Sequence, residues 1–107
     1  MKIINKNEGR TIPYEENNGK ITFNDELMVN LQKYERDFEQ HLDICMDANK
    51  CLAMGLANNY VAQIDIPARQ YEDVVDGVDE DGRDKITKSP LPLDMNNVVL
   101  TLWNVEV

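Results

Sequence analysis

The sequence predicts an α+β domain in which one long amphipathic helix accompanies an antiparallel sheet. Three observations support this prediction. Short β-prone runs joined by turn residues occupy the first 24 residues, a helical repeat of apolar residues begins near residue 25, and an apolar alternating run closes the chain. We expect residues 1–107 to form a single domain, because this is a common domain length and no linker or internal repeat divides the chain.

The first 24 residues contain short strand candidates. The runs "KII" and "TIPY" are brief and β-prone, and "ENNGKITF" carries an Asn-Gly turn signal. After that turn, Ile21 and Phe23 would share one face of a strand. Pro13 cannot donate a backbone hydrogen bond, so the run that contains it is expected at a sheet edge or at a strand start.

The strongest periodic signal lies between residues 24 and 57. Apolar or small residues recur there in steps of three and four, which places them on one face of a helix. Asn24 or Asp25 is suited to cap its start, and Asp25 and Glu26 would lie at the positive end of the helix dipole. The expected apolar face consists of Leu27, Leu31, Tyr34, Phe38, Leu42, Cys45, Ala48 or Asn49, Leu52 and Leu56.

The second half of that stretch also fits a β-hairpin. The runs "LDICMD" and "CLAMGLA" alternate between apolar and other residues, and "DANK" between them would form the turn. A helix of more than 30 residues would be long for a small domain. Residues 41–57 are therefore expected to form either the end of the helix or a hairpin, and the sequence leaves both open.

The rest of the chain is expected to be extended. The run "YVAQIDIPA" is strand-like and closes on a proline, and "KITKSPLPLDM" is extended but poor at central pairing because of its prolines. The final run, "NNVVLTLWNVEV", has the best strand pattern. Val98, Leu100 and Leu102 alternate with Val99, Thr101 and Trp103, so both faces are largely apolar and we expect a covered or central strand.

The charge balance limits the partners. Twenty acidic and eleven basic residues give a net charge of −9, which repels nucleic-acid phosphates and anionic membranes. No apolar run approaches the roughly 18 residues of a membrane span, and the first residues lack the apolar region of a secretory signal. We expect a protein of the host-cell cytoplasm or of a virion, with a protein partner or self-association and no direct contact with nucleic acid or membrane.

The acidic run "EDVVDGVDEDGRD", residues 72–84, raises the question of a calcium site. An EF-hand loop requires acidic ligands at its first and twelfth positions and glycine at its sixth. When Gly82 is the sixth residue, Gly77 and Lys88 occupy the first and twelfth positions, so two ligands are missing. We therefore expect a solvated turn at residues 79–82, in a hairpin excursion, with an acidic partner-binding loop as the alternative.

Catalytic patterns are weak throughout. Ser89 is the only serine and precedes a proline, and the glycines form no phosphate-binding motif. Cys45 and Cys51 do not have zinc-ligand spacing and are expected to be reduced structural thiols. His41 could pair with Asp37 on the expected helix, but a lone helical histidine seldom catalyses. We predict no enzyme and no cofactor.

Two kinds of residue remain as candidate partner contacts. Aromatic residues are enriched at interface hot spots, and Trp103 on an apolar strand is the one to follow, although Phe23, Phe38 and Trp103 are all expected to contribute to the core. Acidic residues could meet a basic partner surface. The candidate contacts are Asp73, Asp76, Asp79, Glu80, Asp81 and Trp103.

In overall character, the lysine- and asparagine-rich start and the closing "DMNNVVLTLWNVEV" resemble the short acidic accessory proteins of bacteriophages and prophages. That resemblance implies a structural or assembly component, and alternatively an anti-defence inhibitor such as an anti-CRISPR. We therefore expect a non-catalytic protein-interaction module, with homo-oligomerisation as one form of it. The alternative is an acidic decoy that occupies a basic, nucleic-acid-binding surface of a host protein.

Overall fold

The computed structural model describes residues 1–57 and 59–104 and shows an all-β protein, so the predicted α+β class with its long helix is wrong. A five-stranded sheet has the order β1-β10-β7-β5-β6, a three-stranded sheet has the order β2-β3-β4, and β8 pairs with β9 alone. The elements are β1 (Lys2–Asn5), β2 (Tyr14–Asn17), β3 (Lys20–Phe23), β4 (Leu27–Asn30), η1 (Leu31–Tyr34), β5 (Gln40–Met46), β6 (Leu52–Met54), β7 (Asn59–Ile66), β8 (Tyr71–Val78), β9 (Asp84–Pro90), η2 (Met95–Asn97) and β10 (Val99–Leu102), where η marks a 3-10 helix.

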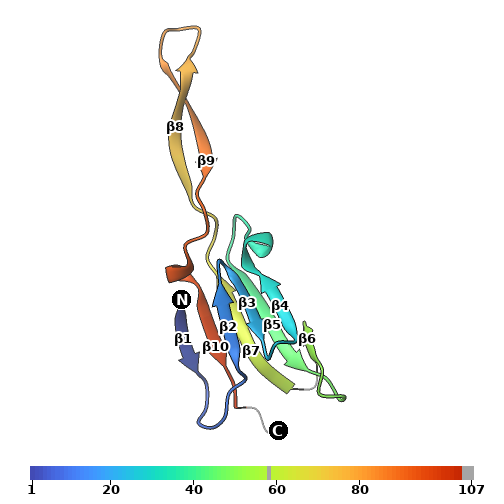
Figure 1. The fold of residues 1–107 in the computed structure, drawn as a ribbon. Helices are drawn as coiled ribbons and strands as arrows, with labels where there is room; N and C mark the ends of the chain where they lie inside the picture. The colour runs from blue at the N-terminus through green and yellow to red at the C-terminus, as the bar shows by residue number, and fades with distance from the viewer. Residues whose placement is uncertain (58, 105–107) are drawn as a thin grey trace.

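The two larger sheets face each other in a β-sandwich, which we call the body (Figure 1). Ile21, Phe23 and Val29 of the smaller sheet belong to one buried cluster with the inner face of the larger sheet. Fully burying such a side chain contributes about 1.5–3 kcal/mol relative to leaving it exposed, so this cluster accounts for the association of the sheets. The larger sheet supplies Leu42, Ile44, Leu52, Val61, Ala62, Ile64, Ile66, Leu100 and Leu102.

The predicted Asn-Gly turn joins β2 to β3. Asn18 and Gly19 both have positive φ, 52° and 79°, which is the conformation that a two-residue hairpin turn requires. Ile21 and Phe23 then share the buried face of β3, as predicted. Pro13 directly precedes β2, which is an edge strand of its sheet.

Residues 25–40, all described by the structure, form a turn, a strand and a 3-10 helix instead of the predicted long helix. Asn24 and Asp25 each have φ of 52° and turn the chain from β3 into β4, so they do not cap a helix. Leu27, Val29 and Leu31 alternate in the way that a strand requires, and this segment pairs with β3 as strand β4. As a result Val29, which the helical pattern omitted, is buried. Phe38, assigned to the core, is 63% exposed.

Residues 41–57 form the hairpin alternative. β5 pairs with β6 across the predicted turn at residues 47–50. The Asp47 carboxylate accepts hydrogen bonds from the backbone N–H groups of Asn49 (2.8 Å) and Cys51 (3.0 Å), which fixes this turn locally. Cys45 is buried and Cys51 exposed, and both are free thiols.

β10 lies between β1 and β7 in the larger sheet, so it is a central strand, one of the two alternatives predicted. It runs parallel to β1 and antiparallel to β7. Val98, Leu100 and Leu102 are buried, as the alternation predicted. The predicted strand extended through residues 105–107, which lie outside the described residues. No helix in the described part of the chain is long and apolar enough to cross a membrane.

Residues 71–90 form the predicted hairpin excursion, which we call the arm. β8 and β9 project from one end of the body as a two-stranded ribbon, and the molecule measures 66 × 22 × 20 Å along its principal axes (Figure 1). The arm therefore sets the length of the molecule.

Candidate interaction surface

The arm exposes nearly all of its side chains. Every residue of β8 is exposed, and five of the seven residues of β9 are exposed as well. The arm carries seven carboxylates and three basic residues, a net charge of −4. Asp79, Glu80 and Asp81 lie in the turn, and Asp73 and Asp76 lie on β8, so the acidic residues predicted from sequence all belong to the arm.

A β-bulge places three aliphatic side chains on one face of the arm. Val75 pairs with Ile86 and Val78 pairs with Asp84, so β8 has one residue more than β9 between the two pairs. Val75 and Val78 would point to opposite faces of a regular strand, but the extra residue returns Val78 to the face of Val75. Gly77, with φ of 88°, supplies the left-handed conformation that the bulge uses.

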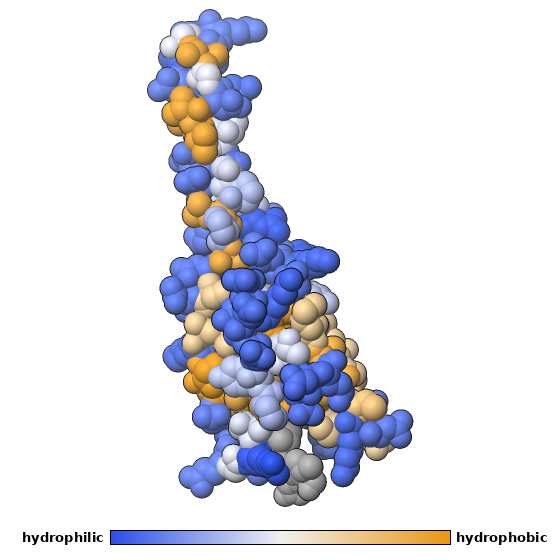
Figure 2. Space-filling model, in the orientation of Figure 1, coloured by the Kyte–Doolittle hydropathy of each residue, from blue (hydrophilic) through white to orange (hydrophobic). Residues whose placement is uncertain are grey.

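We call Val75, Val78 and Ile86 the apolar stripe. Their exposed fractions are 61%, 64% and 60%, which is unusual for aliphatic side chains on neighbouring positions. Figure 2 shows hydrophobic groups along the arm between hydrophilic ones. This stripe was not predicted, although three aliphatic residues inside a highly charged run were the available signal.

The tip of the arm is the predicted turn. The N–H of Gly82 donates to the carbonyl oxygen of Asp79 (3.1 Å), and Gly82 has φ of 80°. The Asp79 carboxylate accepts hydrogen bonds from the backbone N–H groups of Asp81 and Arg83, both at 2.9 Å. This carboxylate therefore holds the turn, while Glu80 and Asp81 are exposed at the far end of the molecule.

The base of the arm is held by contacts with the loop after η1. Arg69 donates its backbone N–H to the carbonyl of Arg36 (2.7 Å) and its guanidinium to the carbonyl (3.0 Å) and carboxylate (3.4 Å) of Glu35. Glu35 is only 8% exposed, so this ion pair is shielded on one side. The Tyr71 hydroxyl donates to the Asp37 carboxylate. These contacts tie the direction of the arm to the body.

His41 lies on the larger sheet, with a different partner from the one expected. Its Nδ1 contacts Asp65, the residue directly opposite on β7, while Asp37 binds Tyr71 instead. Glu39 lies 3.9 Å from the other ring nitrogen, Nε2. The hydrogen bond to Asp65 and its charge raise the pKa of His41. A ring with a carboxylate near each nitrogen suits an imidazolium ion. Glu39, His41 and Asp65 also offer three possible metal-ligand atoms within 4.8 Å of one another, in a largely exposed group.

Trp103 lies on the body and not beside the acidic residues. It follows β10 and stacks on Tyr60 of β7, with ring centroids 5.2 Å apart and planes at 27°. The rings are partly exposed, so Trp103 is only partly in the core, and Tyr60 is a contact partner that the sequence did not reveal. The structure thus separates the six candidate contacts into an acidic set on the arm and one aromatic residue on the body.

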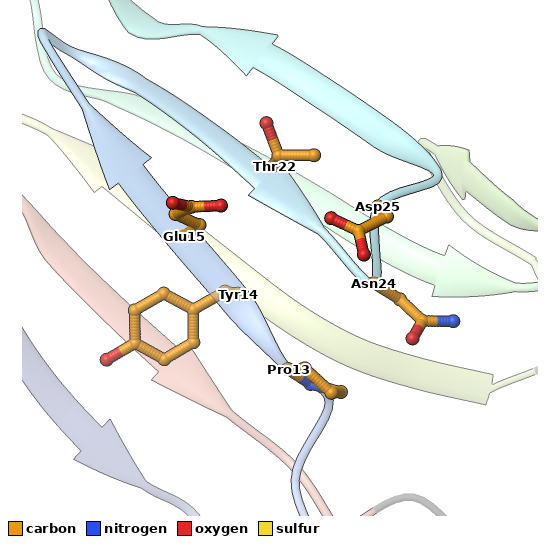
Figure 3. Close-up of a pocket in the computed structure, with 6 residues that line it drawn as sticks. All are labelled: Pro13, Tyr14, Glu15, Thr22, Asn24 and Asp25. Atoms are coloured by element: carbon orange, nitrogen blue, oxygen red, sulfur yellow. The ribbon is translucent and has the colours of Figure 1, made fainter.

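A hollow lies on the outer side of the smaller sheet (Figure 3). It holds about 310 Å³ and is lined by Pro13, Tyr14, Glu15, Thr22, Asn24 and Asp25. Glu15 and Asp25 are both exposed, so neither carboxylate has the dry surroundings that acid–base catalysis uses. The hollow is open to solvent, and its chemistry does not define an active site.

Comparison with known protein families, with curated proteins and with solved structures found no match for this chain. The candidate site therefore stands on its own geometry: an exposed arm with an apolar stripe, an acidic tip and a fixed base.

Proposed function

We propose that this protein is a non-catalytic protein-interaction module that serves as a structural or assembly accessory protein of bacteriophage type. The observation that supports the proposal is the arm, whose strands leave almost every side chain in solvent. An isolated two-stranded hairpin is marginally stable in water. A hairpin with an exposed aliphatic stripe gains stability when another polypeptide covers it.

The body supports the arm without needing it. The buried cluster consists of residues from the body, and the base contacts of Arg69 and Tyr71 hold the arm outward. The N–H of Leu91 donates to the carbonyl of Gln70 (2.8 Å), so the two ends of the arm already lie side by side. This arrangement supports a role in which the arm contacts another molecule while the body supplies folding stability.

Replacing the arm tests the proposal. A variant that joins Gln70 to Leu91 through an Asn-Gly turn should keep the cooperative unfolding of the body and lose association with copies or with a partner. Association is measured by light scattering at tens of micromolar and by protection of the arm from protease in an extract of the source cells. A full-length chain that stays monomeric, with an arm cleaved as fast in extract as in buffer, would contradict the proposal.

The exposed acidic tip favours one second candidate, an inhibitor that occupies a basic groove of a host protein. Asp79 holds the turn and Asp73 pairs with Lys88, so replacing either would change the structure of the arm as well as its charge. The clean variant is Asp76→Asn with Glu80→Gln and Asp81→Asn. An inhibitor should lose affinity for its basic partner, with a weaker salt dependence, whereas a structural role that uses the apolar stripe should survive the change.

A further inference from the structure

The two free edges of the arm differ in charge. β8 carries Glu72, Asp73 and Asp76 and no basic residue, a net charge of −3. β9 carries Lys85 and Lys88 against one carboxylate, a net charge of +1. Among the described residues, each strand of this ribbon pairs on one side only, so each leaves one edge without a neighbouring strand. The arm therefore has an acidic edge and a weakly basic edge.

The residue pairs that face each other across β8 and β9 could also form between β9 of one copy and β8 of a second copy. Asp73 faces Lys88 and forms an ion pair with it, Val75 faces Ile86, and on the other face Val74 faces Thr87. If a second copy is added in the same orientation, its β8 lies antiparallel to β9 of the first. With the register unchanged, Lys88 lies between two Asp73 side chains and Ile86 between two Val75 side chains. In the extended sheet, oppositely charged residues therefore lie beside each other in one cross-strand row, and aliphatic residues lie beside each other in another.

Building on the proposed function, we propose that the partner of the arm is a second copy of this chain, with β9 of one copy paired to β8 of the next. The contact is heterologous, so repetition closes a ring or extends a filament. The apolar stripes then merge into one continuous aliphatic band on a single face of the shared sheet.

Charge decides against the symmetric alternatives. Pairing β8 with β8 of another copy places the acidic edges together, and like charges opposite each other are destabilising. Pairing β9 with β8 places lysine beside aspartate. Each arm still carries a net charge of −4, so neighbouring arms repel one another overall despite the lysine–aspartate contacts, and assembly should strengthen as salt screens this net repulsion.

Cysteine cross-linking tests the pairing directly. In a Cys51→Ser background, which removes the exposed thiol, Val74→Cys and Thr87→Cys are made as two separate variants. Directly opposed residues on antiparallel strands have Cα atoms about 4.5–5.5 Å apart, within the range that a disulfide spans. The mixture of the two variants should give a disulfide-linked dimer under mild oxidation, whereas each variant alone should not.

Val75→Cys is the matched control, because it lies next to Val74 on the other face of the arm. Mixed with the Thr87→Cys variant, it should lose the cross-link. Cross-linked dimers from Val74→Cys alone would indicate pairing of two β8 edges and would overturn the proposal. A chain that gives no cross-link and stays monomeric at high salt would also overturn it. In that case, protection of the arm by a cell extract would still support the proposed function with a different partner.

Discussion

The body and the arm of this protein place similar aliphatic residues in opposite environments. The body buries an aliphatic cluster between two sheets, whereas the arm, built from the same kinds of β-branched residues, leaves them in solvent. The cause is the number of layers. The body has two sheets that cover each other, whereas the arm is a single ribbon of two strands with no second layer over it in the part of the chain that the structure describes. Aliphatic residues in the body therefore contribute to folding, and those in the arm can contribute to binding.

The largest effect should come from the body core. Phe23→Ala removes a fully buried side chain between the sheets and should cost about 3–5 kcal/mol in the free energy of unfolding. The matched change on the arm, Val75→Ala, should cost less than about 0.5 kcal/mol, because that side chain is mostly exposed. Urea unfolding of both variants measures the contrast. Comparable losses would mean that the arm takes part in the fold.

The junction between the two parts should show an intermediate effect. Arg69→Ala leaves the shielded Glu35 carboxylate without its ion pair and removes the guanidinium hydrogen bond to the Glu35 carbonyl, at a cost of about 1–2 kcal/mol. The direction of the arm should also loosen, seen as faster hydrogen exchange at the N–H of Leu91. Lys88→Ala, which breaks an exposed pair within the arm, is the control and should leave that exchange rate unchanged.

A smaller effect should follow from pH. The pKa of His41 is raised in the folded protein by Asp65, so its contribution to stability is complete below the ordinary pKa of 6.5 and is lost as pH rises through the folded pKa. The side chain is mostly exposed, which keeps the effect small. His41→Gln should flatten this part of the profile of Tm against pH. An unchanged profile would mean that the pair with Asp65 does not form.

The turns are the features that the sequence determined by itself. Asn18-Gly19 and Asp79–Gly82 turn where residue type predicted, and Asp47–Lys50 forms the turn of the hairpin alternative. Each depends on glycine dihedrals or on a side chain that bonds to nearby backbone. The alternation of Val98, Leu100 and Leu102 was equally local. It predicted a central or covered strand, and β10 is central in the larger sheet.

Tertiary structure decided between helix and strand in the middle of the chain, where the apolar residues follow both a helical and an alternating pattern. Residues 25–40 were predicted as helix and residues 41–57 were left open between helix and hairpin. Pairing with β3 and β7 selected strand in both parts, and it buries Val29 against the larger sheet. The partner of His41 was equally invisible, because Asp65 is distant in sequence. The apolar stripe depends on a β-bulge in β8, whose extra residue brings Val78 to the same face as Val75. Register and pairing join residues far apart in the chain, and no local pattern contains that information.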